Sequence, residues 1–107
     1  MKTIEEILKD IDLSVVGFEK GVGGYSVRVS DKNSDFKAWI DVHIHDNDIV
    51  TEWNQYIFYL DNADDLRQRY LQDSAELFSL CCEKVEDYLI KIGEIEYSES
   101  GYKYLRK

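Results

Sequence analysis

The hydrophobic positions of this chain switch between two spacings, one typical of helices and one typical of strands. Thr3 to Glu6 has the form of a capping box, and apolar residues follow at helical spacing up to Ile11, which predicts a short N-terminal helix. Strand patterns, alternating or rich in aromatic residues, occupy the next four segments: Leu13–Glu19, Tyr25–Ser30, Phe36–His45 and Ile49–Leu60. Turn residues separate these segments, so we expect an antiparallel meander of about four strands.

The second half of the chain predicts one long helix. Asn62 to Asp65 supplies an N-cap and first-turn acids, and apolar residues keep near-helical spacing until Gly93, a favourable stop. We expect this helix to pack on the apolar face of the sheet. A small C-terminal hairpin is then expected between Glu94–Tyr97 and Tyr102–Leu105, with a frayed tail as the alternative. The prediction is a single acidic α+β domain of residues 1–107, since this length supports one modest core.

Charge adds a second pattern, because the formal net charge of −9 is unevenly distributed. Residues 31–65 hold nine acids and two lysines and so carry −7, whereas residues 1–30 and 66–107 carry −1 each. Such a negative field repels nucleic acid and attracts basic protein surfaces. The simpler alternative is that acidic residues only keep a cytosolic protein soluble, and their concentration in one segment weakens it.

The chain shows no sign of a membrane segment or of a catalytic signature. Its apolar runs are far shorter than the roughly 20 residues that span a bilayer, and its N-terminus lacks the apolar stretch of a signal peptide, so we expect a cytosolic protein with no membrane partner. The adjacent Cys81 and Cys82 diverge on a helix, which predicts two reduced thiols, one of them in the core. Such mid-helix thiols are usually inert, so we expect no enzyme.

The only two histidines lie one residue apart beside several carboxylates. Alternation divides their strand into two faces, with Ala38, Ile40, Val42 and Ile44 on one and Trp39, Asp41, His43 and His45 on the other. Imidazoles about 7 Å apart on one face are able to converge on a zinc ion, with a further ligand from Asp46, Asp48, a neighbouring strand or a thiol. The alternative is a pair of solvated histidines on a wet strand face.

The order of helix, meander and long helix, together with small size and strong acidity, resembles the small phage-encoded anti-CRISPR proteins that inhibit Cas9. This resemblance covers the whole chain in architecture and charge. It implies a stoichiometric inhibitor in the host bacterial cytosol that occupies a basic surface of Cas9 where guide RNA or target DNA would otherwise lie. Acids would then replace phosphates and exposed aromatic residues would anchor the partner. The predicted partner-binding residues are Asp41, Asp46, Asp48, Glu52, Trp39, Trp53 and Tyr56.

Two other functions fit the same size and acidity. An immunity protein that neutralises a toxic nuclease also needs an acidic surface and no catalytic residues. A housekeeping adaptor domain is the third possibility, and the sequence carries no feature that identifies one. Inhibitor and immunity protein share their chemistry and differ in the basic partner that they bind.

Overall fold

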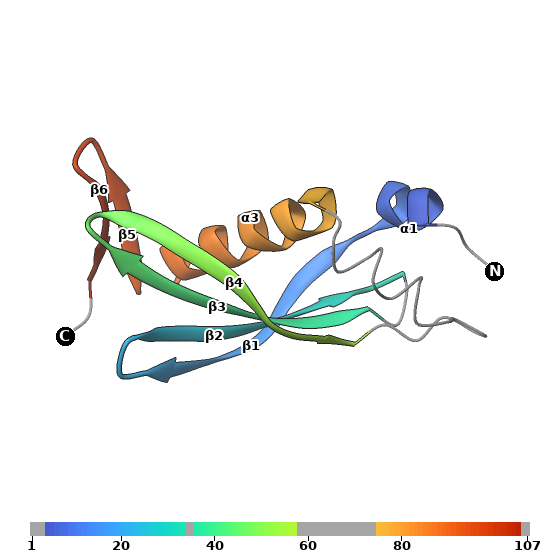
Figure 1. The fold of residues 1–107 in the computed structure, drawn as a ribbon, viewed down its shortest axis with the longest axis horizontal. Coiled ribbons are helices and arrows are strands. Elements are labelled where there is room, and N and C mark those ends of the chain that lie inside the picture. The colour runs from blue at the N-terminus through green and yellow to red at the C-terminus, as the bar shows by residue number, and fades with distance from the viewer. Residues whose placement is uncertain (1–3, 34–35, 58–74, 106–107) are drawn as a thin grey trace.

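The structure is a computed structural model that describes residues 4–33, 36–57 and 75–105, with side chains described for all of these except residues 4, 5, 7 and 55–57. Two helices and six strands follow one another in this part (Figure 1): α1 (Ile4–Asp10), β1 (Leu13–Gly21), β2 (Gly24–Asp31), β3 (Lys37–His45), β4 (Asp48–Ile57), α3 (Ala75–Lys91), β5 (Ile95–Ser98) and β6 (Gly101–Tyr104). The predicted α+β class is confirmed, including the C-terminal hairpin. The predicted start of the long helix, Asn62 to Asp65, lies outside the described residues.

Strands β1 to β4 form one antiparallel sheet in the order of the sequence. Apolar side chains of β2 and β3 fill the face that α3 covers, because alternate residues of a strand point to the same side. Figure 1 shows α3 lying along the sheet, and its buried residues recur every four positions at Leu77, Cys81, Val85 and Leu89. The remaining buried apolar residues are Leu13, Tyr25, Val27, Val29, Phe36, Ala38, Ile40, Val42 and Ile95. Of the elements described, none covers the opposite face, which we call the open face.

Two bulges interrupt the ladder of the sheet. In β1 the register skips Val16, between Val15 and Gly17. In β4 it skips Asn54, because Trp39 pairs with Gln55 while the next residue of β3 pairs with Trp53. A bulged residue leaves the ladder and its side chain is re-aimed, which is a common device beside functional sites.

The C-terminal hairpin ties together the two turns at one end of the sheet. The amide of Tyr102 donates to the carbonyl oxygen of Asn47 in the β3–β4 turn, at 2.8 Å. The Tyr104 hydroxyl accepts from the amide of Ile44 at 2.8 Å and donates to the carbonyl oxygen of Gly23 at 3.3 Å. Since Gly23 lies in the β1–β2 turn and Ile44 in β3, Tyr104 links that turn to the end of β3, while Tyr102 contacts the β3–β4 turn.

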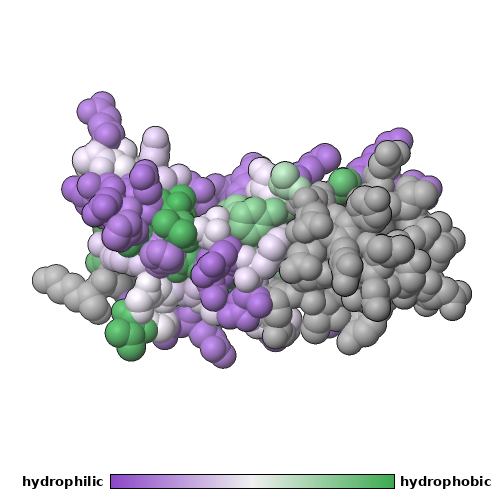
Figure 2. Space-filling view, viewed as in Figure 1, coloured by the Kyte–Doolittle hydropathy of each residue, from purple (hydrophilic) through white to green (hydrophobic). Residues whose placement is uncertain are grey.

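Hydrophilic residues dominate the described surface seen in Figure 2, where hydrophobic residues form only small separate patches. Strongly exposed apolar residues include Val22 in the β1–β2 turn and Val16 in the bulge of β1. Among the described helices, none has the length and hydropathy required to cross a membrane. On the face that Figure 2 shows, polar and charged groups therefore make up most of the described surface available for binding.

Candidate partner-binding site

A row of polar side chains crosses all four strands on the open face. Glu19 of β1 lies opposite Ser26 of β2, and Ser26 lies opposite Asp41 of β3. Asp41 in turn lies opposite Glu52 of β4. We call Glu19, Ser26, Asp41 and Glu52 the acidic row. Because neighbouring strands are about 4.8 Å apart, its three carboxylates lie within about 15 Å.

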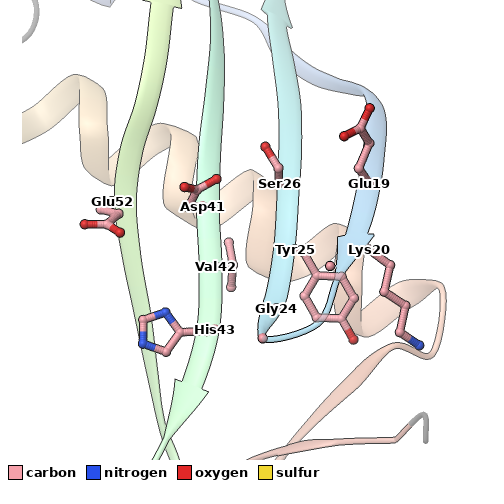
Figure 3. Close-up of a pocket in the computed structure, with 11 residues that line it drawn as sticks. Glu19, Lys20, Gly24, Tyr25, Ser26, Asp41, Val42, His43 and Glu52 are labelled. Carbon is pink, nitrogen blue, oxygen red and sulfur yellow. The ribbon is translucent and has the colours of Figure 1, made fainter.

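The acidic row borders an open pocket of about 340 Å³. Figure 3 shows the small Ser26 side chain between Glu19 and Asp41, with Glu52 beyond Asp41 and His43 at the lower margin. The β1–β2 turn closes the pocket at the same end. This volume is at the lower limit for small-molecule sites, and its walls are side chains that stand on an extended sheet. Such a surface is better suited to side chains of another protein than to an enclosed ligand.

A hydrogen bond fixes the carboxylate at the centre of the row. The side-chain amide of Asn54 donates to both oxygens of Asp41, at 3.1 and 3.2 Å. Asn54 is the bulged residue of β4, so the bulge brings its amide to the open face. Asp41 is half-buried, whereas Glu19 and Glu52 are exposed. The row is therefore held by a side-chain hydrogen bond at its centre and solvated at both ends.

The nearest lysine in the sequence does not neutralise the acidic row. Lys20 follows Glu19 in β1, and its Nζ lies 3.6 Å from the Oε2 of Glu94, a buried carboxylate. Successive strand residues point to opposite faces, so the Lys20 ammonium lies toward the buried Glu94, while part of the Lys20 residue also lines the pocket of the acidic row. Asp41 and Glu52 remain directly opposite each other, an arrangement that destabilises a sheet.

Basic and aromatic groups occupy the next part of the open face. Arg28 of β2 lies opposite Trp39 of β3, and the guanidinium carbon is 5.8 Å from the centre of the indole ring. Val16, Ser30 and Lys37 complete a second pocket of about 410 Å³ around this pair. The open face is thus divided along the strands into an acidic part and a basic, aromatic part.

The structure brings together only some of the predicted partner-binding residues. Asp41 and Glu52 are neighbours in the acidic row, and Trp39 lies half-buried beside them on the same face. Asp46 and Asp48 are exposed at the β3–β4 turn, beyond the row. They belong to the same end of the sheet and extend its negative charge along β3 and β4.

Trp53, one of the two predicted aromatic anchors of β4, does not join this group. Trp53 packs against the core between Phe36 and Phe78, with ring centroids 6.4 and 5.0 Å away, so the expectation of an exposed Trp53 is wrong. The physical reason is alternation, since Glu52 occupies the open face and its neighbour must point inward. Tyr56 pairs in register with Ala38, and its side chain lies outside the described part.

The acidic segment of residues 31–65 also divides on the structure. Asp31 is buried at the end of β2, where its Oδ1 accepts from the amides of Asp12 and Asn33 at 2.8 and 3.2 Å. It therefore stabilises a turn and does not contribute to the open face. The other four acids of the segment, at positions 35, 61, 64 and 65, lie outside the described residues.

The histidines stand on the open face as alternation predicts. The Nε2 of the exposed His45 lies 3.3 Å from the Oδ2 of Asp46, and His43 lines the pocket of the acidic row. Within the described ranges, no group of three or more His, Cys, Asp or Glu side chains is placed to hold a metal ion. Zinc binding by His43 and His45 stays a prediction of the sequence.

The cysteines lie as expected, both as free thiols. Burial raises the pKa of the Cys81 thiol to about 12. The Cys82 thiol donates to the Thr51 hydroxyl at 3.3 Å, and its pKa is raised, mainly by burial. Thiolate reactivity requires a lowered pKa, so neither environment activates a nucleophile.

Sequence reasoning missed two residues of the site, Glu19 and Asn54. The turn at the end of β1 consists of two residues, because Gly21 pairs with Gly24. Counting back from such a turn places Glu19 opposite Ser26, so the spacing of the glycines was sufficient to predict this pairing. For Asn54 the sequence holds no comparable signal, since a bulge depends on how two strands pair.

Comparison of the chain with protein-family models, curated proteins and solved structures found no match. The functional interpretation therefore depends on the site itself.

Proposed function

We propose that this protein is a non-enzymatic, stoichiometric inhibitor that binds a basic surface of a nucleic-acid-processing effector and blocks guide or target DNA engagement. A CRISPR Cas9 nuclease is the first candidate, from the resemblance in size, charge and architecture. The observation that carries the proposal is the acidic row on the open face.

The row has the properties of a surface that substitutes for nucleic acid phosphates. Its carboxylates project from neighbouring strands, so their spacing is set by the backbone and costs little entropy on binding. Arginine and lysine side chains that bind phosphates also bind carboxylates, and a complementary field speeds the encounter. Asp41, whose carboxylate accepts a hydrogen bond from Asn54, provides the centre of such a contact.

Two features of the row favour a binding function over a role in solubility alone. Scattered acids suffice for solubility, whereas Asp41 and Glu52 face each other at a cost to the sheet. A basic partner removes this repulsion when it binds. Trp39 lies beside the row and offers the large aromatic contact that commonly anchors an interface.

Partner capture tests the proposal. The immobilised chain is exposed to Cas9 with and without guide RNA, and to a panel of basic nucleases at about 0.15 M salt. We expect stoichiometric capture of Cas9, and inhibition of its DNA cleavage by the free chain. Capture of a toxic nuclease in place of Cas9 favours the immunity protein. Binding of DNA or RNA by the chain, or capture of none of these proteins, contradicts the proposal.

A further inference from the structure

The acidic row is lowest at Ser26, and we call this gap between two carboxylates the notch. Arg28, on the same strand, has a side chain long enough to fill such a gap. Ser26 is the one small residue of the row, with a carboxylate on either side from Glu19 and Asp41 (Figure 3). Arg28 stands two residues further along β2, on the same face and exposed. Its guanidinium carbon lies 5.8 Å from the centre of the Trp39 ring, and among the described residues no carboxylate forms an ion pair with it.

These two features are related so that two copies of the face complement each other. Two copies whose open faces oppose each other can be related by a two-fold axis that lies between the sheets and parallel to them. The axis runs perpendicular to β2 and passes midway between Ser26 and Arg28. It places Ser26 of each copy opposite Arg28 of the other. Each Arg28 then stands over the Ser26 notch of the other copy, between Glu19 and Asp41. Facing sheets pack about 10 Å apart with interdigitating side chains, which is a distance that an arginine spans.

The neighbours of Arg28 are compatible with this arrangement. Gly17 lies opposite Arg28 and has no side chain, and a guanidinium nitrogen of Arg28 lies over it, 3.5 Å from where a Cβ would stand. When Arg28 turns outward into the other copy, the face at Gly17 is left low where it meets Glu19 of that copy. Trp39, on the other side of Arg28, would meet Asp41. A self-complementary patch of this kind, acidic in one part and basic in the next, is what an isologous two-fold interface requires.

The geometry points to a homodimer of this protein in which the open faces pack together and each Arg28 inserts between Glu19 and Asp41 of the other copy. Four strands of eight to ten residues present a face of about 500 Å², or about 1,000 Å² for both copies, which is small for a stable interface. Each chain also carries −9, which opposes association. The dimer is therefore weak, with dissociation in the range of about 10 μM to 1 mM.

Such a dimer would hide the acidic row, so dimerisation and partner binding exclude each other. This consequence rests on the proposed function, whereas the dimer itself does not. The choice of a second copy over another protein comes from charge complementarity within one face, because this chain carries both the Ser26 notch and the Arg28 side chain that fills it.

Charge reversal with cross-rescue tests the dimer by sedimentation velocity of the purified chain, without any partner. One variant is Arg28→Glu, which makes the face acidic throughout. The other is Glu19→Lys with Asp41→Lys, which makes this part of the face basic. We expect the wild type to dimerise as its concentration approaches about 0.5 mM, each variant to stay monomeric, and an equimolar mixture of the two variants to form a heterodimer.

A matched control uses exposed residues of α3, on the other side of the sheet. Lys84→Glu and the pair Glu83→Lys with Asp87→Lys make the same changes in net charge and should leave wild-type dimerisation within about twofold. Circular dichroism checks that every variant folds. If a face variant does not fold, amide chemical shifts of the wild type on dilution decide, since they should move in β2 and β3 and not in α3.

Three results overturn the proposal. The first is a wild-type chain that is monomeric at about 0.5 mM. The notch would then be a site for an arginine of another protein and not for Arg28 of a second copy. The second is a dimer that Arg28→Glu leaves intact. The third is a pair of folded monomeric variants whose mixture does not associate. Because no partner protein enters the experiment, its failure leaves the proposed function standing.

Discussion

Replacing Glu52 by glutamine should stabilise the fold. Asp41 and Glu52 are directly opposite on neighbouring strands, so their charges are about 6 Å apart. Their repulsion is about 0.7 kcal/mol in water, and about half of that at 0.15 M salt. Glu52→Gln keeps the shape of the side chain and removes the repulsion. The expected gain is about 0.3–0.7 kcal/mol, which raises the melting temperature by about 2–5 °C in a domain of this size.

Thermal unfolding followed by circular dichroism at about 10 mM and 500 mM salt measures this effect. The matched control is Glu99→Gln in the exposed β5–β6 turn, which changes the net charge equally without a carboxylate placed opposite. The gain from Glu52→Gln should exceed that of the control at low salt and shrink at high salt. If Glu52→Gln leaves the melting temperature unchanged or lowers it, or if its gain over the control does not depend on salt, repulsion between Asp41 and Glu52 does not destabilise the sheet.

Three further predictions concern the C-terminal hairpin, the thiols and the histidines. Gly101→Ala should lower the free energy of unfolding in urea by about 1–3 kcal/mol, because Gly101 has φ +101° and an added Cβ would lie 2.4 Å from the Asn47 carbonyl oxygen. At pH 8 a thiol reagent should modify Cys82 slowly and Cys81 only after unfolding, because burial raises both pKa values. Elemental analysis of protein purified without a histidine tag should find about one zinc per chain, lost when both histidines are replaced by alanine.

Each of these predictions has a result that contradicts it. Gly23→Ala is the control for the hairpin, since an added Cβ there meets nothing within 4 Å, and an equal loss at both positions would discount the contact with Asn47. Rapid modification of Cys81 in the folded chain would show that the core under α3 is open. If the protein is metal-free and its stability is unaffected by chelator, the two histidines are solvated residues of a strand face and not zinc ligands.

The sequence predicts the two faces of β3 well, because alternation is a local property of the backbone. It identifies Ala38 and Ile40 as core residues and Trp39 and Asp41 as residues of the open face, as the structure shows. Apolar periodicity likewise identifies the residues by which α3 packs on the sheet. These features account for the confirmed fold class.

The composition of the site is less accessible to sequence reasoning, because it depends on which residues lie opposite one another. Glu19 is 22 positions before Asp41 and joins it only through the register of two strand pairs. The bulge at Asn54 changes that register within β4, and no residue type in the local sequence requires it. Trp53 shows the converse, since its aromatic character suggested an exposed anchor, whereas strand alternation directs it toward the covered face, where it is partly buried against the core.

Quantitative binding of Cas9 to variants of the acidic row decides whether this face is the binding surface. The row variant combines Glu19→Gln, Asp41→Asn and Glu52→Gln, and affinity is measured by biolayer interferometry at about 0.15 M salt. The control neutralises three exposed acids elsewhere, Glu83, Asp87 and Glu99, and leaves Glu86, which accepts a hydrogen bond from the Tyr102 hydroxyl.

We predict that the row variant binds about 100-fold more weakly, since each lost charge contact contributes about 1 kcal/mol, while the control stays within about threefold of the wild type. Equal losses in both variants would show that only net charge matters. Wild-type affinity in a folded row variant would contradict the claim that this face binds the partner.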